Sequence, residues 1–298
     1  GIEMKARHLR FSEILFLGDI EELNSVNIDD DHVTLGAGVS LKSMIDLFSP
    51  KKEYTGLVEM LRLFAGSQIR NVSTWVGNVV TASPISDLLP IFMVLNCTLK
   101  VQSNASERTI SIHNFITGYR KTSLMPGEIV TAIMIPRLDD NSRLFAYKQS
   151  KRKYDDITIV NMAFKTTVVN EMIKSVDVAV GGIAPTTLFF KGCFRDTIGI
   201  CDAEVVAESI EAVIFDKISL DNSTPGGMAE YRKVLVASMI LQMLHEKKKK
   251  DTISIEPTEI LSKQVYPSNL DISSSKPHLS GLKHTTGEAI YTDDLPKF

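Results

Sequence analysis

Polar side chains interrupt an apolar stretch at residues 77–90, which read GNVVTASPISDLLP. Hydroxyl, amide and carboxylate groups cost free energy when they are buried without hydrogen-bond partners. These groups therefore either satisfy the backbone at the start of the helix expected at residues 88–94 or bind a ligand. Asp87 suits a ligand that carries hydroxyl groups, because an ionised carboxylate only accepts hydrogen bonds. The alternative is that Asp87 or Ser86 caps the helix.

The segments around this stretch alternate between expected helices and expected strands. Apolar residues recur every three or four positions at residues 41–48 and 57–64, which predicts two helices. Long apolar runs at residues 157–169 and 173–183 predict strands, with helical segments after them. Shorter strands are expected at residues 32–41, which include a glycine turn, and at 97–103, 108–115 and 128–136. The sequence therefore predicts an α+β fold with two sub-domains.

The composition limits the classes of partner. The chain has 298 residues, a formal net charge of -3 and 44% hydrophobic residues. This charge gives no sign of nucleic-acid binding, and no apolar run reaches the roughly 18 to 20 residues of a membrane-spanning helix. The three cysteines lack metal-ligand spacing, so we expect no metal site and a reducing compartment. We expect a cytoplasmic protein, with a peroxisomal location as the alternative, and neither nucleic acid nor membrane as a partner.

Several motifs occur together in an order that marks one enzyme family. Residues 61–90, 118–122 (GYRKT) and 145–164 (FAYKQSKRKYDDITIVNMAF) resemble the flavin domain of the molybdenum hydroxylases, in particular that of the xanthine dehydrogenases. Residues 224–228 (TPGGM) resemble a later motif of that domain, and residues 276–296 resemble the start of the molybdenum-binding domain.

The resemblance implies a domain organisation in four parts. We expect a PCMH-type FAD-binding domain without its N-terminal part at residues 1–140 and a CO-dehydrogenase-flavoprotein-like C-terminal domain at 141–250. A linker at 251–275 and the start of the molybdenum-binding domain at 276–298 follow.

The resemblance also implies a set of flavin-contacting residues between the two sub-domains, and it gives none of them a catalytic role. Asp155 matches an acidic residue beside the reactive face of the flavin, where its charge would tune access for NAD. The expected FAD contacts are Phe64, Thr74, Trp75, Val76, Gly77, Asn78, Asp87, Val130 and Lys148.

Three departures from the family pattern bear on flavin binding. Val76 replaces a glycine, and a β-branched residue would be strained there if the position needs a positive φ or close approach to the ligand. Leu63 replaces a tryptophan of the mammalian enzymes. The family's glycine-containing pyrophosphate loop lies upstream of the stretch that matches residues 1–5, so we expect the isolated chain to bind flavin weakly and to be inactive in purine oxidation.

The implied function is an FAD-binding electron-transfer segment that passes electrons from iron–sulfur clusters to NAD during purine oxidation. The iron–sulfur clusters and molybdopterin would belong to the full-length enzyme and not to this chain. The implied partners are the remaining domains of the same enzyme, in a homodimer. Two alternatives remain open: an aldehyde oxidase-like flavin segment, and a non-catalytic remnant without bound flavin.

Overall fold

The structure is a computed structural model that describes residues 8–170, 172–195, 203–220, 224, 226–246, 281–286 and 288–290. The described residues up to position 246 belong to one compact unit, and the short helix α11 (Gly281–Thr286) belongs to a second. The predicted linker at residues 251–275 lies outside the described residues, as does most of the predicted start of a molybdenum-binding domain. In the part of the chain that the structure describes, no helix is long and apolar enough to cross a membrane.

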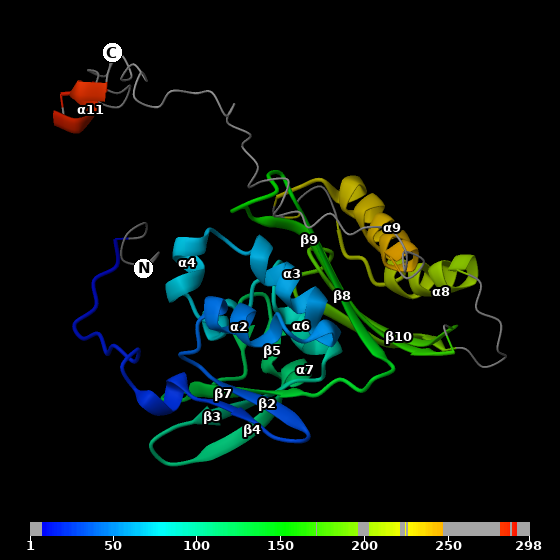
Figure 1. Cartoon of the computed structure of the whole chain (residues 1–298), viewed down its shortest axis with the longest axis horizontal. Helices are drawn as coiled ribbons and strands as arrows, with labels where there is room; N and C mark the ends of the chain where they lie inside the picture. The colour runs from blue at the N-terminus through cyan, green and yellow to red at the C-terminus, as the bar shows by residue number, and fades with distance from the viewer. Residues whose placement is uncertain are drawn as a thin grey trace, which may run out of the picture. The chain divides into compact units, whose positions relative to one another are not determined.

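The N-terminal part of the large unit is an antiparallel five-stranded sheet with helices packed on it (Figure 1). The predicted helix at residues 41–48 is confirmed as α2 (Leu41–Phe48). It begins there because the Ser40 side chain caps its first turn, accepting a hydrogen bond from the Ser43 N–H at 3.0 Å. The strands, in sheet order, are β1 (Val26–Ile28), β2 (His32–Gly36), β7 (Ile129–Pro136), β3 (Thr98–Gln102) and β4 (Glu107–Ser111). The other helical segments are η1 (Glu21–Asn24), η2 (Lys52–Tyr54), α3 (Thr55–Leu63), α4 (Ser67–Val72), α5 (Trp75–Val80), α6 (Leu89–Val94) and α7 (Ile112–Phe115). A two-stranded ribbon of β5 (Ile116–Gly118) and β6 (Lys121–Thr122) completes this part.

The strand predicted at residues 108–115 is too long, because the chain turns into α7 after Ser111. The Ser111 hydroxyl accepts a hydrogen bond from the His113 N–H at 3.4 Å and so caps the helix. Ile112 and Phe115, three positions apart, are then both buried in the core. Over four residues, a strand's alternation and a helix's spacing are hard to distinguish in the sequence.

The C-terminal part is an antiparallel four-stranded sheet that is covered on both faces. Its order is β11 (Leu188–Arg195), β10 (Met172–Gly181), β9 (Thr158–Val169) and β8 (Ser142–Ser150). Helices α8 (Ala203–Phe215) and α9 (Ala229–Glu246) pack on one face, and α3 and α6 from the N-terminal part pack on the other (Figure 1). Coverage on both faces explains why residues 158–164 of β9 are all buried and do not alternate between buried and exposed.

Small residues let the N-terminal helices approach this sheet closely. Ala146, Ala163 and Ala179 are neighbours on β8, β9 and β10 and belong to the core that the N-terminal part builds. Gly56 on α3 lies so close to β8 that a Cβ there would come within 2.7 Å of the Leu144 carbonyl oxygen. The two halves of the unit therefore share one tightly packed interface.

We expect Gly56→Val to lower the free energy of unfolding by about 1 to 3 kcal/mol, because the added side chain would push α3 away from β8. Urea unfolding measures this change. Gly77→Ala is the control, since a Cβ at Gly77 would meet no atom within 4 Å and alanine favours a helix. Equal destabilisation by the two substitutions would contradict the close packing.

Candidate functional site

A cleft of about 880 Å³ lies where the N-terminal part meets the C-terminal sheet, and we call it the α5 cleft. Seven of the ten residues expected at the flavin line it, whereas Trp75, Val76 and Val130 are not among its lining residues. The seven are Phe64, Thr74, Gly77, Asn78, Asp87, Lys148 and Asp155.

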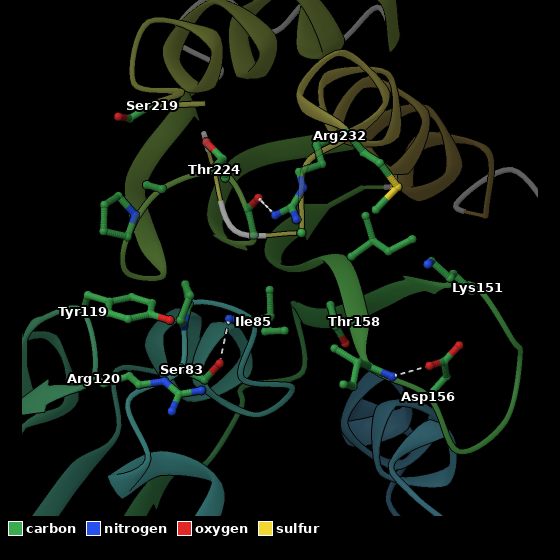
Figure 2. A pocket seen from close by; sticks show the side chains of 18 residues that line it. Ser83, Ile85, Tyr119, Arg120, Lys151, Asp156, Thr158, Ser219, Thr224 and Arg232 are labelled. Atoms are coloured by element: carbon green, nitrogen blue, oxygen red, sulfur yellow. Dashed lines mark hydrogen bonds between the residues drawn. The ribbon is translucent and has the colours of Figure 1, made fainter. Parts of the chain in front are cut away.

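A second cavity of about 730 Å³ adjoins the α5 cleft, and we call it the Arg232 cavity (Figure 2). Figure 2 shows Tyr119 and Arg120 on one side of this cavity and Lys151 on the other, with Arg232 above them. The two cavities are neighbours, since six residues line both. The shared residues are Ser83, Ile85, Arg120, Asp156, Ile157 and Thr158.

The loop at residues 83–87 forms the boundary between the two cavities, and polar contacts fix its backbone to the C-terminal sheet. The Gly182 N–H donates to the Pro84 carbonyl at 2.8 Å, and the Asn161 side-chain amide donates to the Ser86 carbonyl at 2.9 Å. From the other side, the Asn78 side-chain oxygen accepts hydrogen bonds from the Ser86 hydroxyl at 2.6 Å and from the Leu88 N–H at 3.1 Å. The polar residues of this stretch thus satisfy a buried loop that has no regular structure.

Asp87 is the buried anion at the end of this loop. One carboxylate oxygen accepts a hydrogen bond from the Thr158 hydroxyl at 2.5 Å, and the other accepts one from the Lys148 ammonium at 3.0 Å. The Lys148 side chain is only 3% exposed and that of Asp87 only 11%. Asp87 therefore does not cap α6, and the helix-cap alternative is wrong for this residue. Ser86 retains a weak capping contact, since its hydroxyl accepts a hydrogen bond from the Leu89 N–H at 3.4 Å.

Trp75 and Val130 belong to the core and not to the cleft wall. Trp75 is fully buried, and its indole N–H donates to the Gly36 carbonyl at 2.8 Å. Val130 is 6% exposed and pairs with Val101 across β7 and β3.

Val76 takes helical backbone geometry within α5, and it is absent from the described residues that have a positive φ. The strain expected from a β-branched residue at this position therefore does not arise. Its neighbour Gly77 borders open space, because a Cβ there would meet no atom within 4 Å.

Several lining residues were not expected from the sequence. Thr158 begins β9 directly after the DDI stretch, but a threonine at a strand start is too common to indicate a partner for Asp87. Arg120 lies in the GYRKT motif, and the sequence motif alone assigns no role to this residue. Arg120 lines both cavities, and its φ of 52° shows that the chain turns sharply there.

No group of three or more His, Cys, Asp or Glu side chains in the described ranges could hold a metal ion. Hydrogen-bonding groups and charged side chains of both signs line the α5 cleft. Arg120, Lys148 and Arg152 line the α5 cleft together with Asp87, Asp155 and Asp156.

Comparisons with known proteins identify the class of protein to which this fold belongs. Residues 1–138 match the family described as FAD binding domain in molybdopterin dehydrogenase, and residues 145–247 match the CO dehydrogenase flavoprotein C-terminal domain. The chain superposes on a carbon monoxide dehydrogenase chain from Hydrogenophaga pseudoflava with a TM-score of 0.74, at 18% identity over 82% of this chain and 86% of that one. Fold and cleft together define a two-part flavoprotein.

Sequence identity to curated relatives identifies the enzyme family within this class. The chain is 34% identical to a xanthine dehydrogenase of Emericella nidulans over 99% of its length and 32% identical to a xanthine dehydrogenase/oxidase of Gallus gallus over 100% of it. It is also 30% identical to aldehyde oxidase 1 of Bos taurus over 99% of its length. The chain spans about a quarter of the length of these relatives, 24% for the first and 25% for the other two. It belongs to the molybdenum hydroxylase family and carries that family's flavin-binding segment.

Three features of the α5 cleft fit an FAD molecule. The open space beside Gly77 lets a ligand approach the backbone of α5 closely. The Ser73 hydroxyl, at the cleft wall, is buried and has no hydrogen-bond partner within the described part of the chain. Asp87 has also not exhausted its acceptor capacity, because an ionised carboxylate has about four lone-pair sites and two donors reach it here.

We expect Asp87→Ala to destabilise the chain by about 3 to 5 kcal/mol, because it leaves the Lys148 ammonium buried without a counter-charge. Thr158→Val should cost only about 1 to 2 kcal/mol, since it removes one hydrogen bond and keeps the ion pair. Chemical denaturation measures both changes. The double variant Asp87→Ala/Lys148→Met should recover part of the loss. A double variant no more stable than Asp87→Ala would show that Lys148 does not depend on Asp87.

Proposed function

We propose that this chain is the FAD-binding electron-transfer segment of a xanthine dehydrogenase-like enzyme. In this proposal it passes electrons from iron–sulfur clusters to NAD during purine oxidation. The clusters and the molybdopterin lie in other parts of the enzyme, and the enzyme is a homodimer in the cytoplasm or peroxisome. The observation that carries the proposal is the pair of adjoining cavities on either side of the loop at residues 83–87. Two neighbouring ligands can meet along this loop, as a cofactor and its electron acceptor must.

FAD would occupy the α5 cleft and, when bound, supply the electron-transfer chemistry. Thr74 and Gly77 form the wall that a ligand can approach closely. Asp87 offers its remaining acceptor capacity to sugar or ribityl hydroxyls. The ion pair with Lys148 holds the Asp87 carboxylate in place. Phe64 lines the same cleft and offers an aromatic ring for contact with the flavin ring system.

The electron acceptor would occupy the Arg232 cavity. Arg120 and Lys151 line it with positive charge, which suits the phosphates of a dinucleotide. The buried Arg232 guanidinium donates to the Gly182 carbonyl at 2.7 Å and to the Gly227 carbonyl at 2.9 Å, so it braces the cavity wall. Asp155 would adjust the charge at the mouth of the neighbouring cleft, because it lines that cleft on an exposed loop.

The 30% identity to a bovine aldehyde oxidase keeps an aldehyde oxidase-like segment as the second candidate. Both candidates require FAD in the α5 cleft, and they differ in the substrate and in the acceptor. A remnant without bound flavin would keep the fold and lose the ligand. Measurements of FAD binding and of acceptor reduction therefore separate the three possibilities.

We expect FAD to bind the purified chain saturably and to quench the fluorescence of Trp75, the single tryptophan, which lies in α5 beside the cleft. Gly77→Leu should weaken binding at least tenfold, because its side chain would fill the space that the ligand needs. Ser238→Leu, an exposed position on α9, is the matched control and should bind like the parent. If neither the parent nor the control binds FAD at any accessible concentration, the flavin-free remnant is the better description.

The acceptor site predicts a charge effect at one lysine and not at its neighbour. In FAD-loaded protein that has been reduced chemically, Lys151→Glu should slow reoxidation by NAD about tenfold, a barrier change of about 1.4 kcal/mol. Lys153→Glu carries the same charge change in the same loop at a residue that lines neither cavity, so its rate should stay within about twofold of the parent. Reoxidation by oxygen checks that the flavin itself remains competent. Equal slowing by the two lysine variants would contradict the assigned cavity.

A further inference from the structure

Arg232 is a buried cation near the start of α9, and it holds two stretches of backbone. The residue is only 6% exposed, and its Nη1 and Nε atoms donate to the Gly182 carbonyl at 2.7 Å and to the Gly227 carbonyl at 2.9 Å. Burial lowers the pKa of the guanidinium, but an arginine stays protonated at neutral pH, so both bonds have a charged donor. Such bonds are stronger than those between neutral groups. The backbone at Gly182 is therefore firmly fixed to α9.

Gly182 passes this connection on to the loop that separates the two cavities. It directly follows β10, and its N–H donates to the Pro84 carbonyl at 2.8 Å. Its carbonyl is the group that accepts from Arg232. Two hydrogen bonds, joined by a single residue, thus connect Arg232 to the loop at residues 83–87.

The backbones along this connection touch directly, without side chains between them. A Cβ added at Gly181 would come within 2.9 Å of the Pro84 carbonyl oxygen. Gly182 has a φ of 90°, and a Cβ there would collide with the Ile159 carbonyl oxygen. Because no flexible side chain can absorb a displacement, a shift of Gly182 would move Pro84.

The loop at residues 83–87 depends on contacts from outside itself. It follows Ala82, which is 1% exposed and has a φ of 50°, in the left-handed region that a residue with a side chain seldom adopts. The loop lies between α5 and α6 and belongs to no helix or strand. Neighbouring groups must therefore hold it in place, and the Gly182 N–H is the backbone group of the C-terminal part that does so.

Arg232 and Asp87 lie on opposite sides of this loop. Arg232 is among the residues that line the Arg232 cavity but not among those of the α5 cleft, and the reverse holds for Asp87 (Figure 2). We propose that Arg232 is a positioning residue for the α5 cleft: through Gly182 and Pro84, it sets where the loop presents Asp87 to a ligand. This inference rests on the proposed function, because that ligand is FAD.

Two substitutions separate the geometry of Arg232 from its charge. Arg232→Met removes both donors and keeps an unbranched side chain. Arg232→Lys keeps the charge but lacks the rigid fork of nitrogens that holds two carbonyls at once. Met239→Ala is the matched control for lost stability, because Met239 is buried on the same face of α9, seven positions further on. Met239 is not among the lining residues of either cavity.

FAD titration by quenching of Trp75, well below the unfolding temperature, measures the effect on the α5 cleft. We expect Arg232→Met and Arg232→Lys each to weaken FAD binding about tenfold, the scale of one lost hydrogen bond to the Asp87 carboxylate. Met239→Ala should bind within about twofold of the parent, although it unfolds at a lower urea concentration. Parent-like binding by Arg232→Met, or equal weakening by Met239→Ala, would overturn the proposal.

Hydrogen exchange of the flavin-free chain measures whether Arg232 holds the loop. The Leu88 N–H, at the end of the loop, donates to the Asn78 side-chain oxygen at 3.1 Å and so reports on loop opening. We expect Arg232→Met to raise its exchange rate about tenfold relative to the amides of β9. Met239→Ala should leave this ratio unchanged, because it destabilises the whole unit and not the loop alone.

The two measurements distinguish the possible failures. Weaker FAD binding by Arg232→Met with a parent-like exchange ratio would mean that Arg232 contacts FAD directly, which would overturn the connection through the loop. The exchange experiment needs no flavin. A parent that binds no FAD, together with a raised ratio in Arg232→Met, would therefore reject the FAD proposal and support control of the loop by Arg232.

Discussion

A buried ion pair between Asp87 and Lys148 is the constraint on which the rest of this structure depends. Taking a lysine ammonium out of water costs several kcal/mol unless an anion and further hydrogen bonds compensate it. Lys148 lies on β8 of the C-terminal sheet, and its counter-charge comes from a loop of the N-terminal part. Unless both halves are in place, neither charge has its partner. The position of the loop at residues 83–87, and with it the division between the two cavities, follows from this requirement.

Close packing keeps that pair in place. The aligned alanines of β8, β9 and β10, together with Gly56 of α3, bring helices and sheet nearer than larger residues would allow. Such an interface is stiff, because a close-packed interior transmits any displacement. The loop at residues 83–87 is fixed to this interface by side-chain amides, because Asn161 donates to the Ser86 carbonyl and Asn78 accepts from the Ser86 hydroxyl. Rigid placement is what a site needs if it is to hold a cofactor in one orientation.

The rim of the α5 cleft is held by hydrogen bonds at exposed positions and not by close packing. The loop at residues 150–157 is exposed, is organised by its own carboxylate and backbone contacts, and reaches α4 through Tyr154. The exposed rim is thus held mainly by hydrogen bonds, whereas the interface between the two halves is held by close packing. Hydrogen bonds at exposed positions contribute little to global stability, so the rim can vary without loss of the fold.

The sequence by itself determined the periodic elements. Apolar spacing predicts α2 and the long strands β9 and β10, and the ordered motifs indicate a flavin-binding segment. Local signals were less reliable where two patterns overlap, as at Ser111, where a cap ends a strand that alternation alone would continue.

Only the tertiary structure decided what each side chain of the motifs faces. Trp75 and Gly77 are two positions apart in one motif, yet Trp75 is buried in the core and Gly77 borders the cleft. Asp87 finds its partners 61 and 71 positions away, at Lys148 and Thr158. Periodicity specifies a buried face without naming the element that will cover it, because that choice depends on how helices and sheet pack across the whole unit.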